Sequence, residues 1–173
     1  MAVESSPDDL KIRVIGLNGD VCGHLLLPLD TIVGALKRTI GSKVNIPSKR
    51  QRLLHSTTIL RDDMSLSQCL GQVRADNSDP FDLFREKELD IALMKRPDDQ
   101  VDALEQIEQC LYEDALLPYL EDITNQDDKL HLLDEIDIIW AAVPVSHLAM
   151  EYASERIRRD KHYILELLRL DNG

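Results

Sequence analysis

The sequence has few cysteines and no long apolar run, and each absence excludes a class of protein. Its three cysteines, Cys22, Cys69 and Cys110, are odd in number and far apart, unlike the paired cysteines of a secreted disulfide framework. No apolar stretch is long enough to cross a bilayer, and no N-terminal hydrophobic run resembles a signal peptide. We therefore expect a protein of the cytosol or the nucleus that does not interact with membranes.

Motifs that hold cofactors or carry out catalysis are also missing. The chain has no Gly-rich phosphate loop and no nucleophile elbow, and its five histidines show no metal-binding spacing. Cysteine–histidine catalysis needs a thiolate held by a nearby base, whereas we interpret all three cysteines as small core hydrophobes. The sequence thus predicts a protein that is not an enzyme, with no catalytic residue, no cofactor, no metal and no evident small-molecule substrate.

The net charge of −12 is concentrated in one part of the chain. Residues 1–97 carry a net charge of +1, residues 98–137 carry −13, and residues 138–173 carry zero. A block this acidic repels nucleic acid and anionic membranes, and the chain has no Arg-aromatic pattern for RNA. We therefore expect partners that are proteins. The acidic block is either a solvated face of helices or a surface that pairs with basic residues of the chain itself, which are Lys37, Arg38 and Lys43 or Lys49 and Arg50.

The spacing of apolar residues changes near Pro97. Before it, residues 10–15 and 89–93 alternate as in half-buried strands, and Asn18-Gly19 favours a type I′ hairpin turn. After it, apolar residues recur every three or four positions, as in helices. We predict a disordered leader over residues 1–9, an α+β domain over 10–97 with a long loop at 71–87, and an α-helical domain over 98–173.

One helix is expected inside the first domain. Asp30 is predicted to cap it, and Ile46-Pro47 is predicted to break the pattern that follows, because proline disfavours a helical conformation in the preceding residue. The residues expected on its buried face are Ile32, Leu36 and Ile40, and those expected on its exposed basic face are Lys37, Arg38 and Lys43.

The order of these elements, with several short motifs, resembles ubiquitin and the ubiquitin-like domains. The motifs are Asn18-Gly19 between two strands, Asp30-Thr31-Ile32 at the start of a helix, Ile46-Pro47, and Gln51-Arg52-Leu53. The resemblance spans residues 10–97, about half of the chain, and it implies a β-grasp fold. The fold class expected for the whole chain is therefore α+β, with a β-grasp domain followed by an all-α helical domain.

The resemblance also implies a surface for binding other proteins. The positions that form the family's main recognition patch are Leu17, Leu54 and Ala92, with Arg52 beside them. Independently of the family, three apolar side chains facing water and rimmed by Arg and His suit transient docking. Asp90 stands where ubiquitin has a histidine, and Ala92 is small, which should weaken binding to standard ubiquitin receptors.

The Gly-Gly tail that conjugation requires is missing, because Met94-Lys95-Arg96-Pro97-Asp98 continues directly into more protein. We therefore expect a non-catalytic adaptor with an integral, non-conjugatable ubiquitin-like domain, whose partners include receptors of the ubiquitin pathway. Two alternatives stay open. One is a proteasome shuttle that binds ubiquitin through its tail, although the tail lacks the Met-Gly-Phe type loop of the common ubiquitin-binding bundle. The other is a cysteine hydrolase acting on ubiquitin conjugates through Cys69 or Cys110.

The C-terminal residues 138–173 are similar to a family of helical repeats of unknown function. Residues 139–143 and 164–168 would be equivalent helices 25 positions apart, and the chain stops early in the second copy. Helical repeats usually need several units to bury a continuous core. We therefore expect an incomplete repeat, and the family brings no known activity with it.

Overall fold

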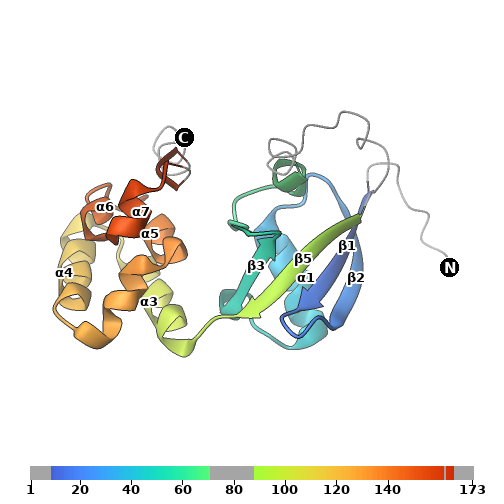
Figure 1. The fold of residues 1–173 in the computed structure, drawn as a ribbon, viewed down its shortest axis with the longest axis horizontal. Coiled ribbons are helices and arrows are strands. Elements are labelled where there is room, and N and C mark those ends of the chain that lie inside the picture. Colours follow the sequence, from blue (N-terminus) through green and yellow to red (C-terminus); the bar gives the residue numbers. More distant parts are fainter. Residues whose placement is uncertain (1–8, 71–87, 162, 166–173) are drawn as a thin grey trace. The chain divides into compact units, whose positions relative to one another are not determined.

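The computed structural model describes residues 9–70, 88–161 and 163–165. The chain divides into two compact units at the boundary between Arg96 and Pro97 (Figure 1). The predicted leader lies outside the described residues except for Asp9, which begins the first strand, and the predicted loop 71–87 lies outside them entirely. The first unit contains a mixed sheet with a helix, and the second is helical, so the predicted α+β class is confirmed.

The sheet of the first unit has five strands in the order β2-β1-β5-β3-β4. The central strands β1 and β5 are parallel, while β2 is antiparallel to β1 and β3 is antiparallel to both β5 and β4. The strand bounds are β1 Asp9–Gly16, β2 Val21–Pro28, β3 Gln51–His55, β4 Thr58–Ile59 and β5 Glu88–Lys95.

One face of this sheet is buried against helix α1, Val33–Val44. The buried residues on β1 and β5 alternate with residues that point to the other face, as strand geometry requires. The core residues contributed by β1, β3, β5 and α1 are Leu10, Ile12, Val14, Leu53, Leu89, Ile91, Leu93, Val33, Leu36 and Ile40. The predicted alternation of residues 10–15 and 89–93 therefore places the core correctly.

The hairpin between β1 and β2 differs from the predicted type I′ turn. Such a turn needs positive φ at both central residues, but only Gly19 has one, at 85°. The Gly19 N–H instead donates to the Gly16 carbonyl at 2.9 Å, and the strand register shifts between Val14 and Ile15. The turn is therefore longer than predicted, with a bulge beside it.

Helix α1 begins at Val33, and Asp30 does not cap it. Its first amides are bonded by carbonyls from a distant loop: Val33 N–H donates to Met64 at 2.8 Å, and Gly34 N–H donates to Asp62 at 2.9 Å. These contacts satisfy donors that a side-chain cap would otherwise serve. Ile32, predicted to be buried, is 45% exposed.

Lys37 is buried, which contradicts its predicted place on an exposed basic face. Its side chain is 2% exposed and its ammonium forms an ion pair with the Asp62 carboxylate, whose side chain is 63% exposed. The helix therefore uses Lys37 to hold the loop at Asp62, whereas Arg38 and Lys43 remain exposed.

A buried glutamine at the start of β3 is hydrogen-bonded to α1 and to the segment that follows it. Gln51 Nε2 donates to the Lys37 carbonyl at 3.0 Å and to the Ile46 carbonyl at 2.7 Å, beside the short 3-10 turn η1, Ser48–Arg50. A Cβ at Gly41 would lie 2.9 Å from the same Ile46 carbonyl. The close approach requires glycine there, and it positions the start of β3.

The second unit is built from short helices around an apolar core. The element bounds are α3 Asp98–Gln109, α4 Glu113–Thr124, η3 Asp127–Asp134, α5 Ile136–Ala142, α6 Ala149–Tyr152 and α7 Glu155–Arg159. Its larger core residues are Val101, Ile107, Leu116, Leu120, Ile123, Leu132, Leu133, Ile136, Ile138, Ile139 and Ile157. Among the described helices, none combines the length and apolarity needed to span a bilayer.

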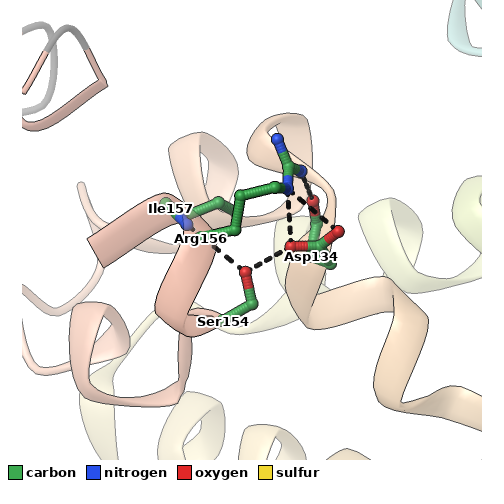
Figure 2. A network of polar contacts seen from close by, with 4 residues as sticks. All are labelled: Asp134, Ser154, Arg156 and Ile157. Carbon is green, nitrogen blue, oxygen red and sulfur yellow. Dashed lines mark hydrogen bonds and ion pairs between the residues drawn. The ribbon is translucent and has the colours of Figure 1, made fainter. Parts of the chain in front are cut away.

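A polar network joins the end of η3 to the start of α7 (Figure 2). Ser154 donates to the Asp134 carboxylate and accepts from Ile157 N–H at 3.4 Å, which makes it the N-cap of α7. Arg156 Nε donates to the same carboxylate at 2.9 and 3.1 Å. Burial raises the pKa of Asp134, but these hydrogen bonds outweigh the effect of burial and leave the pKa below its usual value.

The predicted second repeat copy lies mostly outside the described residues, so that repeat stays a prediction.

The burial of Lys37 predicts unequal effects of the two changes that break its ion pair. Asp62→Asn should destabilise the first unit by about 1–3 kcal/mol, because a buried ammonium loses its charged partner. Lys37→Met should cost less, since Asp62 is mostly solvated and the methionine fills an apolar site. Urea unfolding followed by NMR signals of the first unit measures both. Equal losses, or a larger loss for Lys37→Met, would contradict this assignment.

Candidate functional site

The exposed face of the sheet carries one cross-strand row of apolar residues, which we call the apolar row: Ile15, Ala92, Leu54 and Ile59. Ile15 of β1 is in register with Ala92 of β5, Ala92 is in register with Leu54 of β3, and Leu54 is in register with Ile59 of β4. All four are partly exposed. Their sequence neighbours on β1, β3 and β5, such as Val14 and Leu53, are buried on the other face. The row is therefore a consequence of strand alternation.

Two predicted patch residues meet in this row, and the other two lie beside it. Leu54 and Ala92 are direct cross-strand partners. Arg52 is in register with Met94. These two residues form the next outward-facing pair on β3 and β5 after Leu54 and Ala92. Leu17 lies in the hairpin turn two residues beyond Ile15 and is 71% exposed.

Ile15 and Val21 were not predicted as part of the site. Val21 of β2 is in register with Ile15 and is 51% exposed, so it extends the apolar row toward the sheet edge. The period-two pattern already placed Ile15 on the outer face with Lys11 and Arg13. Strand alternation alone could therefore have found it, whereas Val21 depends on the bulge in the hairpin.

An ion-paired row lies directly next to the apolar row. Arg13 Nε donates to Asp90 Oδ1 at 2.7 Å and Arg13 Nη2 donates to Asp90 Oδ2 at 2.5 Å, in a bidentate arrangement between β1 and β5. The His55 ring nitrogen Nδ1 lies 2.8 Å from the Asp90 carbonyl. Hydrogen bonding from the Arg13 guanidinium, together with its charge, holds the pKa of the Asp90 carboxyl below its usual range.

Asp90 is therefore a paired charge within a polar border. The expectation that it weakens receptor binding needs this qualification, because the Arg13 guanidinium offsets its negative charge. The border is mixed in sign, since Lys11 of β1 is in register with Glu88 of β5. An apolar centre with a polar rim of both signs is the usual composition of a transient docking surface.

The Arg13–Asp90 pair makes a prediction about pH. The depressed pKa of Asp90 means that the pair stabilises the folded protein above the ordinary aspartate value of about 3.9. That contribution is lost as the pH falls through the lower, folded-state pKa. Carboxyl-carbon NMR should show Asp90 titrating below the usual range, and Arg13→Gln should raise its pKa. An unchanged titration in Arg13→Gln would rule out this pairing in solution.

The three cysteines occupy different environments, so the prediction that all are core residues is wrong for two of them. Cys69 is 1% exposed, and burial raises the pKa of its thiol to about 11. Cys22 is exposed because it points outward from β2. Cys110 is partly exposed, and its thiol donates to the Gln106 carbonyl at 3.2 Å.

This difference predicts the order in which the thiols react. Iodoacetamide at about pH 8 should alkylate Cys22 in the native protein and leave Cys69 protected until denaturant is added, because the thiolate is the nucleophile. Peptide mass spectrometry over time measures each site. Native labelling of Cys69 as fast as Cys22 would show an accessible, activated thiol.

The described residues contain no group of three or more His, Cys, Asp or Glu side chains placed to hold a metal ion. In the second unit, His131 Nε2 lies 2.7 Å from Asp99 Oδ2, and its Nδ1 lies 2.9 Å from the Asp128 carbonyl. The contact with Asp99 joins η3 to the start of α3, and the contact with Asp128 lies within η3.

Comparison with protein families finds a match within the first unit. Residues 10–75 match the ubiquitin family. These residues all lie in the first unit, so the predicted resemblance to ubiquitin-like domains is confirmed for that part of the chain. They include Leu17, Arg52 and Leu54 of the predicted patch, while Ala92 lies beyond them.

Similar solved structures include a ubiquitin, a design based on ubiquitin and a ubiquitin-like domain. A ubiquitin from Caldiarchaeum subterraneum is 19% identical, with a TM-score of 0.39, and the match covers 51% of this chain and 95% of that one. A designed protein based on ubiquitin is 13% identical, with a TM-score of 0.40 and coverage of 53% and 93%. The N-terminal ubiquitin-like domain of the 4931431F19Rik protein is 19% identical, with a TM-score of 0.39 and coverage of 56% and 83%.

Proposed function

We propose that this chain is a non-catalytic adaptor that binds other proteins through the exposed face of its ubiquitin-like unit. The observation that carries the proposal is the register of Ile15, Ala92 and Leu54 across three neighbouring strands. A rigid sheet holds this apolar row in the open, and burying it on a partner contributes free energy in proportion to its apolar area. The proposed contact residues are Leu17, Arg52, Leu54 and Ala92, together with Ile15.

The chain that follows the sheet supports an integral module over a conjugated one. Strand β5 ends at Lys95, and α3 begins only three residues later, at Asp98. Arg96 is 9% exposed, its N–H donates to the Arg50 carbonyl at 2.8 Å, and its Nη1 donates to the Lys49 carbonyl at 3.0 Å. A tail used for conjugation has to be extended and accessible. The segment after β5 is instead hydrogen-bonded through Arg96 to the first unit.

Receptors of the ubiquitin pathway are the partners that we propose for this surface. The acidic helical unit would then supply a second contact or a scaffold, and two weak contacts on one chain give avidity. We place this activity in the cytosol or the nucleus. The buried Cys69, whose thiol pKa is about 11, argues against a cysteine hydrolase that uses this residue as its nucleophile, and leaves Cys110 as the thiol that such an enzyme would need. The shuttle alternative would require the second unit itself to bind ubiquitin.

The test is Leu54→Glu in the full chain, titrated with a panel of purified ubiquitin-receptor domains and followed by NMR. A charge in the centre of the apolar row should weaken binding at least tenfold, because the carboxylate must be desolvated on docking. The matched control is Leu26→Glu, which places the same charge on the same face of the sheet. Leu26 is 40% exposed and lies opposite Lys11, away from the apolar row.

Binding of a receptor domain with shifts centred on β1, β3 and β5, lost in Leu54→Glu and kept in Leu26→Glu, is the expected result. Equal binding by the wild-type chain and Leu54→Glu would show that the apolar row is not the binding surface. Shifts centred on the helical unit upon adding ubiquitin itself would favour the shuttle instead.

A further inference from the structure

The second unit exposes an apolar corner between α3 and α4. Leu111 is 75% exposed and Tyr112 is 74% exposed, more than any other large hydrophobic residue in the described part of the chain. Both lie in the short connection between Gln109, the last residue of α3, and Glu113, the first residue of α4. Solvent exposure of two adjacent large apolar side chains is unfavourable, so this corner is a candidate contact surface.

The apolar surface continues from this corner along α4. Tyr112, Ala115 and Tyr119 are spaced by three and four residues, which places them on one side of the helix. Ala115 is exposed and Tyr119 is partly exposed. We call Leu111, Tyr112, Ala115 and Tyr119 the α4 stripe. The core residues Leu116, Leu120 and Ile123 of the same helix are at most 1% exposed, so the stripe runs along the edge of its buried face.

Carboxylates from both helices border this stripe. Helices α3 and α4 contain nine Asp and Glu residues and no Lys or Arg. Burial raises the pKa of the Tyr119 phenol, and Cys110, Asp102 and Asp122 raise it further. Asp102 belongs to α3 and Asp122 to α4, so negative charge from both helices acts on the same tyrosine. Asp102, Asp114 and Asp122 are all exposed.

We propose that the α4 stripe binds a basic segment of another protein that also carries apolar side chains. The apolar side chains of that segment cover Leu111 and Tyr112, and its Lys and Arg residues pair with the surrounding carboxylates. Charge complementarity favours a basic partner for this surface. Its carboxylates repel anionic nucleic acid and lipid and attract cationic segments over a distance. A second copy of this chain would bring the same carboxylates face to face.

This surface is distinct from the apolar row of the sheet, and the proposal does not depend on the function proposed for that row. The partner classes differ as well. The sheet face has a rim of mixed charge, whereas the α4 stripe has a rim of one sign. Leu54→Glu should therefore leave binding at the α4 stripe unchanged, which separates failure of one proposal from failure of the other.

The experiment uses the full chain and a fluorescein-labelled synthetic peptide with Lys and Leu at helical spacing. Fluorescence anisotropy should show saturable binding that weakens at least tenfold when NaCl is raised from about 50 mM to about 500 mM. Two comparison peptides should not bind: one with Glu in place of Lys, and one with Ser in place of Leu. The first tests the charge, and the second tests the apolar contact.

Two sets of variants locate the site. Leu111→Ser with Tyr112→Ser should weaken peptide binding at least tenfold and keep the fold, because serine is a favoured N-cap residue at the position that Tyr112 occupies. The matched control is Leu26→Ser, an exposed apolar residue of the first unit that belongs to neither proposed surface. Asp102→Asn and Asp122→Asn should each weaken binding about twofold or more and reduce its salt dependence, with the exposed Asp30→Asn as control.

Three results would overturn the proposal. The first is equal peptide binding by the wild-type chain and the double serine variant, with both folded by circular dichroism. The second is equal binding of the Glu peptide. The third is sedimentation showing that the chain self-associates through Leu111 and Tyr112 in the absence of peptide, which would make a second copy the occupant.

Discussion

Burial of one face of the sheet against α1 is the constraint on which the first unit depends. Because side chains alternate along a strand, burying Leu10, Ile12 and Val14 forces Arg13 and Ile15 outward. The same requirement on β5 and β3 turns Ala92 and Leu54 to the outer face. The candidate docking surface is thus the other side of the core, and a shift of one residue in register would destroy both together.

The parts of the fold that follow from local spacing could be predicted, and those that depend on distant contacts could not. The alternation of residues 10–15 and 89–93 predicted the sheet, whereas the resemblance to ubiquitin predicted that Leu54 and Ala92 share one surface. The start of α1 depends on carbonyls of Asp62 and Met64, and the burial of Lys37 depends on a carboxylate 25 residues away. The spacing of apolar residues in the sequence after Asp30 cannot predict either contact. Val21 joined the site only through the hairpin bulge.

The two units present different chemistry to partners. In the first, positive and negative side chains are interleaved, and Arg13 and Asp90 offset one another. In the second, α3 and α4 carry charge of a single sign, and the nearest basic residue along the chain after them is Lys129. Neutral mixed surfaces bind through shape and apolar area, whereas one-sign surfaces select partners by charge and lose affinity in salt. A protein with both kinds of surface can discriminate between two classes of partner.

The parallel pairing of β1 with β5 has a mechanical consequence. Strand β1 begins at Asp9 and strand β5 ends at Lys95, so these two points lie at opposite ends of one parallel strand pair. Tension applied through the chain would pull these strands along their length in opposite directions. All the hydrogen bonds between them would then bear the load together, where a hairpin pulled from its open end breaks them one after another. The force needed to separate β1 from β5 would then depend on the whole pairing, and the same pairing holds Ile15 and Ala92 in register on the outer face.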